Sequence, residues 1–113
     1  MKRSSSCHKL VLFASIASVA AVAVRAADQP EKYTYVIVHG ATAGGWEWKE
    51  TGKYLLENGH TVYRVTLTAL GERSHLSAEG VNLTTHINDV VNTILFEDLN
   101  DVILTGHSYG GRV

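Results

Sequence analysis

The sequence predicts an α/β fold, in which a mostly parallel β-sheet carries helices on both faces. Short β-branched and apolar runs alternate with segments of helical periodicity, in the order strand, helix, strand, helix, strand. A helix-length segment joins each strand to the next, as parallel strands require, and such connections favour right-handed crossovers. The composition, with 45% hydrophobic residues, ten glycines and one proline, is typical of a globular domain.

The first strand–helix–strand unit is predicted between residues 33 and 67. Tyr33 to Val38 is β-branched and aromatic and is expected to form a strand that ends at His39 and Gly40. A helix should follow and end at Asn58 and Gly59. Its predicted face contains Trp48, Gly52, Leu55 and Leu56. A second strand is expected over residues 61–67.

The second helix has the clearest periodicity in the chain, with Asn82 as its expected N-cap. Its apolar face contains Leu83, Ile87, Val90, Val91, Ile94 and Leu95. Val102 to Thr105 then forms a short run that suits a fully buried strand. Because three parallel strands alone would leave both sheet edges bare, we expect residues 27–113 to be the N-terminal part of a longer domain of roughly 200–250 residues.

Residues 1–26 have the layout of a secretory signal peptide. Basic residues precede an uncharged, mostly apolar run from Leu10 to Val24, and Ala26 completes a cleavage site of small residues. The alternatives are a buried helix and a retained membrane anchor, although the run is short for a membrane span. Cleavage would remove Cys7, which is the single cysteine, and would export residues 27–113 to the periplasm or out of the cell.

The charge balance excludes several classes of partner. Ten Lys and Arg residues stand against eleven Asp and Glu, and cleavage after Ala26 would leave six basic residues against the same eleven acidic ones. We therefore expect no binding to nucleic acid or to an anionic membrane. No residue spacing suggests a metal site, no glycine-rich stretch fits a nucleotide-binding loop, and we expect no cofactor. The sequence leaves the oligomeric state open.

The motif that carries chemistry is G-x-S-x-G, written Gly106-His107-Ser108-Tyr109-Gly110, directly after the third predicted strand. A serine hydroxyl is a poor nucleophile unless it is exposed, oriented and next to a base. A sharp strand-to-helix turn exposes it, with strained backbone angles at the serine and glycines where neighbouring backbone approaches closely. Ser108 is therefore a candidate nucleophile, and a glycine-rich turn without a catalytic role is the alternative.

The stretches VIVHGATAGGWEW, LTALGERSHL and GHSYGG resemble the α/β-hydrolases, and most of all the branch with plant methylesterases and hydroxynitrile lyases. The resemblance covers residues 33–113 and implies the N-terminal portion of an α/β-hydrolase fold. It implies that Ser108 is the nucleophile and that the backbone amides of Ala41 and Tyr109 hold an oxyanion. The family's catalytic acid and histidine follow later strands, so residues 27–113 alone are expected to be inactive.

The resemblance favours hydrolysis of a small-molecule carboxylic ester through a Ser-His-Asp type triad. Two alternatives stay open. One is a lyase of the hydroxynitrile type, in which the same serine and histidine move a proton without acylation. The other is a non-catalytic binding protein on the same scaffold. The acyl and alcohol preferences cannot be deduced from this part of the chain.

Five residues near the expected site have further predicted roles. His75 lies in a loop at the carboxyl end of a predicted strand and is a candidate for the wall of the substrate pocket, with a solvated or loop-stabilising role as the alternative. Glu72 and Arg73 are expected to form a structural ion pair. Trp46 and Trp48 are expected in the core and in the pocket wall.

Overall fold

The computed structural model describes residues 30–113 of the chain. The predicted signal peptide, residues 1–26, lies outside the described residues. The strands are β1 (Thr34–Val38), β2 (Thr61–Val65) and β3 (Val102–Gly106), and the helices are α2 (Lys49–Glu57) and α3 (Leu83–Phe96). Short 3₁₀ turns in the same part of the chain are η1 (Gly45–Trp48), η2 (Gly71–Arg73) and η3 (Ser108–Gly111).

The strands form one parallel sheet in the order β2-β1-β3, and their parallel direction confirms the prediction. Thr34, at the start of β1, is level with Thr61 of β2 and with Val102 of β3. Because the strands begin level and run the same way, the loops that follow them leave the sheet at the same edge. β1 is central, so the loop after Val38 starts between the ends of the other two strands.

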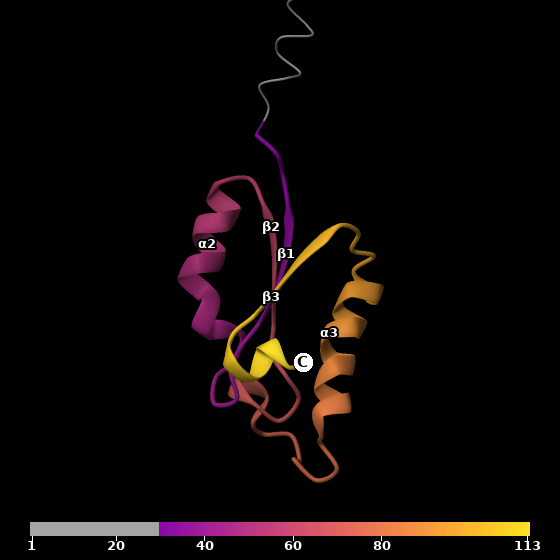
Figure 1. Cartoon of the computed structure of the whole chain (residues 1–113). Coiled ribbons are helices and arrows are strands. Elements are labelled where there is room, and N and C mark those ends of the chain that lie inside the picture. The colour runs from indigo at the N-terminus through magenta and orange to yellow at the C-terminus, as the bar shows by residue number, and fades with distance from the viewer. Residues whose placement is uncertain (1–29) are drawn as a thin grey trace, which may run out of the picture. The chain divides into compact units, whose positions relative to one another are not determined.

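The helices α2 and α3 lie on opposite faces of the sheet (Figure 1), which confirms the predicted two-sided architecture. The main cluster of buried apolar side chains consists of Val36, Val38, Val65, Leu67 and Val90. Removal of these apolar side chains from water stabilises the packing of α3 on the sheet. α3 begins at the expected N-cap, where the Asn82 side chain accepts a hydrogen bond from the Thr85 amide at 3.2 Å.

Two expectations about packing are wrong. β3 is not fully buried, since Ile103 is 37% and Leu104 is 57% exposed. The reason is that α2 packs mainly on β2 and α3 mainly on β1 and β2, so β3 is the strand of the described sheet with the fewest buried residues. The second expectation is that the predicted face of the first helix packs on the sheet along its whole length. On α2, Gly52 is buried against the sheet but Leu56 is exposed, because this helix packs mainly on the edge strand β2.

One boundary also differs from the prediction. β2 ends at Val65, before the expected Leu67, because the Leu67 amide donates a hydrogen bond of 3.0 Å to His39 Nε2. The helix predicted to follow the third strand begins at Ser108 as expected, and over the described residues 108–111 it is a single 3₁₀ turn. Neither helix within residues 30–113 has both the length and the apolar character to cross a membrane.

Candidate active site

Ser108 is exposed in the turn that directly follows β3. Its φ of 51° lies in the left-handed region, which costs a non-glycine residue about 1–3 kcal/mol. The His107 amide donates to the Val38 carbonyl at 3.0 Å, and the Gly110 amide donates to the His107 carbonyl at 2.9 Å. These hydrogen bonds hold the turn against the end of β1 and fix the strained conformation that the sequence predicts for Ser108.

The motif glycines allow this turn to pack tightly. A Cβ on Gly110 would lie 2.5 Å from the Val38 carbonyl oxygen and 2.6 Å from that of His39. A Cβ on Gly106 would overlap the Gly110 carbonyl group. Backbone atoms in a packed interior cannot move aside as the end of a flexible side chain can. Both positions therefore need glycine, as the sequence predicts.

His39 directly follows β1 and is fully buried, with both ring nitrogens hydrogen-bonded. The Leu67 amide can only donate, so Nε2 is the acceptor of that bond and the ring proton is on Nδ1. Nδ1 then donates to the Gly40 carbonyl oxygen at 2.6 Å. Because the Gly40 carbonyl and the Ala41 amide belong to one planar trans peptide, this bond also fixes the direction of the Ala41 N–H.

The Gly40–Ala41 peptide lies beside the serine turn. A Cβ on Gly40 would be 3.6 Å from Ser108 Cβ and 3.4 Å from His107 Nδ1. Ala41 is exposed, and its amide has no acceptor among the residues that the structure describes. The fold therefore brings the end of β1 and the turn after β3 together, as the resemblance implies, and Tyr109 contributes the amide that directly follows Ser108.

The other end of the loop after β1 is held by side chains from β2 and from the segment after it. The Gly45 amide donates to Thr66 Oγ1 at 2.8 Å, and Arg64 donates to the Gly45 carbonyl at 3.2 Å. Thr66 Oγ1 in turn donates to Glu72 Oε1 at 2.5 Å. This hydrogen bond from Thr66 is the main reason that the pKa of Glu72 is lowered, since it stabilises the carboxylate.

The expected ion pair between Glu72 and Arg73 is wrong. Glu72 binds Thr66, whereas Arg73 lies 3.5 Å from Asp89 of α3 and donates to the Thr66 carbonyl at 2.9 Å. Glu72 thus binds the segment after β2, whereas Arg73 links that segment to α3. His75 is exposed in the same loop and lines neither of the two cavities described next, so its role in a substrate pocket stays a prediction.

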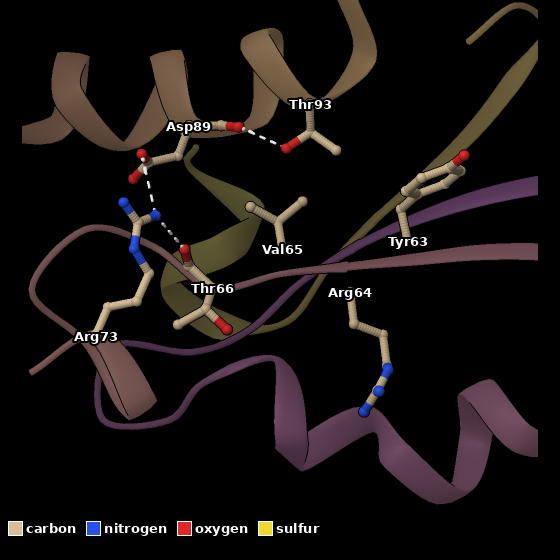
Figure 2. Close-up of a pocket in the computed structure, with 7 residues that line it drawn as sticks. All are labelled: Tyr63, Arg64, Val65, Thr66, Arg73, Asp89 and Thr93. Carbon is tan, nitrogen blue, oxygen red and sulfur yellow. Dashed lines mark hydrogen bonds and ion pairs between the residues drawn. The ribbon is translucent and has the colours of Figure 1, made fainter. Parts of the chain in front are cut away.

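A cavity of about 300 Å³ lies along β2 and carries residues from α3 and from the loop after β2. Figure 2 shows Arg73 reaching from that loop to Asp89 on α3, with Arg64 pointing away on the other side of the strand. None of the residues that line this cavity belongs to the G-x-S-x-G motif. Its charged side chains already have partners within the protein. We therefore do not assign the active site to this cavity.

A smaller cavity of about 230 Å³ adjoins the serine turn through His107 and is also lined by Glu47, Trp48 and Thr51. His107 Nδ1 is 4.0 Å from Glu47 Oε2, and its ring stands edge-on to Trp48. Trp48 therefore forms part of a cavity wall, and its role in a substrate pocket stays a prediction. Trp46, in the η1 turn, is 60% exposed, so the expectation that it is a core residue is wrong.

The structure adds one residue to the site that sequence analysis left without a role. His86 of α3 is buried, and its ring binds the hydroxyl of Tyr109. The available signal was its position four residues before Val90, which places a polar side chain on the apolar face of the helix. Within residues 30–113, no three His, Cys, Asp or Glu side chains come together as a metal ion would need.

Known proteins identify the family of this fold and site. A sequence model described as the alpha/beta hydrolase family matches residues 35–113. The chain belongs to this family. The α/β-hydrolase fold predicted from the motifs is therefore confirmed. The parallel sheet with helices on both faces is the part of that fold that this chain contains.

The relatives of this α/β-hydrolase include several esterases. Carbendazim hydrolyzing esterase of Nocardioides is 53% identical over 79 residues, which are 70% of this chain and 33% of that protein. Methylesterase 1 of Arabidopsis thaliana is 31% identical over 86 residues, 74% of this chain and 33% of that protein.

A solved extracellular alpha/beta-hydrolase from a Paenibacillus species has a similar structure. Its TM-score is 0.64 at 36% identity, and the match covers 71% of this chain and 32% of that one. The chain thus spans about a third of the length of these relatives. The predicted resemblance to small esterases and plant methylesterases is confirmed.

Proposed function

We propose that this α/β-hydrolase hydrolyses carboxylic esters with Ser108 as its nucleophile. The observation that carries the proposal is the position of Ser108, which is exposed at a φ of 51° beside the Gly40–Ala41 peptide. An exposed serine held in a strained turn at the carboxyl edge of a parallel sheet suits nucleophilic attack. The esterase names of its relatives support the same reaction class.

In the proposed reaction, Ser108 Oγ forms a bond to the ester carbonyl carbon while its proton passes to a histidine base. The tetrahedral intermediate then breaks its bond to the alkoxy oxygen, which takes that proton and leaves as the alcohol. Water attacks the resulting acyl-enzyme, releases the carboxylic acid and returns a proton to Ser108. The base is proposed to come from a segment C-terminal to residue 113, as the family resemblance implies. The buried His39 and His86 use both ring nitrogens in other hydrogen bonds.

The amides of Ala41 and Tyr109 are the proposed donors to the oxyanion. His39 supports the first of them, because its bond to the Gly40 carbonyl fixes the peptide plane. That bond also polarises the peptide and makes the Ala41 N–H a stronger donor. Removal of one preorganised donor of this kind typically lowers kcat by about 10²–10³-fold.

For the substrate, we propose small carboxylic esters, with methyl esters as the first to be tested. Support comes from the relatives named methylesterase. The hydroxynitrile-lyase alternative predicts cleavage of a cyanohydrin without ester hydrolysis. A non-catalytic binding protein would turn over neither compound.

We also propose that the protein is exported after cleavage of residues 1–26. The order of basic residues, apolar run and small-residue site in this segment supports the proposal. A structural neighbour described as extracellular is consistent with it.

The nucleophile is tested with Ser108→Ala in the full-length protein. We expect ester hydrolysis to fall by at least about a thousandfold, because the residues of a catalytic triad act as a unit. Ser77→Ala removes the hydroxyl of another exposed serine and should leave turnover unchanged. Labelling by a fluorophosphonate should need Ser108 and not Ser77. A Ser108→Ala enzyme that kept more than about a tenth of the activity would exclude Ser108 as the nucleophile.

A further inference from the structure

His86 is a buried histidine on α3, only 8% exposed, whose two ring nitrogens both face hydrogen-bond partners. Nε2 lies 3.0 Å from the Thr68 carbonyl oxygen, and Nδ1 lies 2.8 Å from the Tyr109 hydroxyl. A carbonyl oxygen can only accept, so Nε2 carries a proton, and in the neutral imidazole Nδ1 then accepts from the Tyr109 hydroxyl. The contacts therefore define one tautomer and one direction for the hydrogen bond.

The Thr68 carbonyl is a well-fixed support for this ring. The Thr68 amide donates to Asp89 Oδ2 at 2.6 Å, and the Thr68 hydroxyl donates to Asp89 Oδ1 at 2.8 Å. Asp89 is three residues after His86 on α3, so both side chains lie on neighbouring positions of the helix. Its position is held further by Arg73 at 3.5 Å. α3 thus holds Thr68 with one side chain and Tyr109 with the other.

Tyr109 joins this network to the proposed catalytic serine. Its ring is half-buried against the core, and its amide directly follows Ser108 in the turn. With the hydroxyl bound to His86, the ring is restrained at its far end as well as at its Cα. A residue restrained at both ends limits the movement of the backbone between β3 and η3.

We propose that His86 is a positioning residue, which acts through the Tyr109 hydroxyl to hold the Tyr109 amide where the oxyanion forms. The inference rests on the proposed function of Ser108 and Tyr109. Small displacements of a preorganised donor lower the rate of the chemical step more than they lower substrate binding. The signature of this role is a lower kcat at an unchanged KM.

The direct test compares Tyr109→Phe with Tyr63→Phe in the full-length protein. Each change removes one hydroxyl and keeps the ring, and the Tyr63 hydroxyl binds Glu97 at 3.2 Å, at the outer edge of the sheet. We expect Tyr109→Phe to lower kcat for ester hydrolysis about tenfold with KM unchanged within about twofold. Tyr63→Phe should keep the kcat of the wild type.

A second pair of variants separates the two nitrogens of His86. In His86→Asn the amide oxygen can replace Nδ1 as the acceptor from Tyr109, whereas in His86→Gln the amide nitrogen can replace Nε2 as the donor to Thr68. We expect His86→Asn to keep most of kcat and His86→Gln to lose as much as Tyr109→Phe. The double variant His86→Gln/Tyr109→Phe should be no slower than either single variant, because both remove the same interaction.

The outcomes distinguish this proposal from the proposed function. If Ser108→Ala keeps its activity, the proposed function fails and the role of His86 fails with it. If hydrolysis depends on Ser108 but Tyr109→Phe keeps the wild-type kcat, only the role of His86 fails. The role of His86 would also fail if His86→Asn and His86→Gln lost kcat equally and in proportion to the decrease in their unfolding midpoints. Such a result would indicate a structural role alone. Nitrogen-15 NMR of His86 should show the proton on Nε2, and a proton on Nδ1 would contradict the assigned direction.

Discussion

Gly110→Ala should separate the serine turn, residues 106–110, from the end of β1. An added Cβ would lie 2.5 Å from the Val38 carbonyl oxygen, about 0.9 Å short of the 3.4 Å at which ordinary contact begins. The Cβ would also lie 2.6 Å from a second backbone oxygen, that of His39. A small rotation of the Gly110 backbone that moved the Cβ away from one oxygen would therefore leave the clash with the other. The turn must therefore move outward and stretch the 3.0 Å hydrogen bond between His107 and Val38.

The expected cost is about 3 kcal/mol, at the upper end of the range for overpacking, because both clashes involve backbone. For a domain of roughly 200 residues this corresponds to a decrease of about 6–12 °C in the Tm. A shift of the turn by nearly 1 Å also displaces the Tyr109 amide, which should lower kcat by up to about a hundredfold.

The measurement is thermal unfolding of the full-length protein by circular dichroism, together with ester hydrolysis. Gly111→Ala is the matched control, since among residues 30–113 its Cβ would meet only the Gly106 carbonyl oxygen, at 3.8 Å. Its Tm should stay level or rise slightly, because alanine lowers the entropy of the unfolded chain. Equal Tm values for Gly110→Ala and Gly111→Ala would refute the close packing of the serine turn on β1.

Two further predictions concern Glu72 and the N-terminus. Because the pKa of Glu72 is lowered from 4.5, mainly by Thr66, its contribution to stability is complete above pH 4.5 and is lost as the pH falls through the lowered value. Thr66→Val should therefore lower the free energy of unfolding, measured in urea, more at pH 7 than at pH 3. A loss of stability that is the same at both pH values would contradict the proposed effect of Thr66 on the Glu72 carboxylate. Intact-mass analysis of exported protein should give an N-terminus within two residues of Ala27, and a mass that still included Met1 would exclude cleavage.

Local features of the sequence determined the elements of this fold. The apolar spacing over residues 83–95 and the Asn82 cap predict α3 because helix formation depends on residues three and four apart. The G-x-S-x-G motif after a strand predicts the turn at Ser108, because only glycine fits its flanking positions and few conformations join a strand to a helix so sharply. Chain order then predicts a parallel sheet with one common edge for the loops.

Tertiary structure decided which distant groups meet at that edge. His39 binds an amide 28 residues away, and His86 binds a hydroxyl 23 residues away. The sequence shows both histidines but not their partners, since a partner depends on strand order, register and the rotation of α3 about its axis. The same holds for Arg73, which binds Asp89 of α3 and not its neighbour Glu72. Hydrogen bonds and ion pairs act over a few ångströms, so their partners are fixed only once the packed core has set the distances between elements.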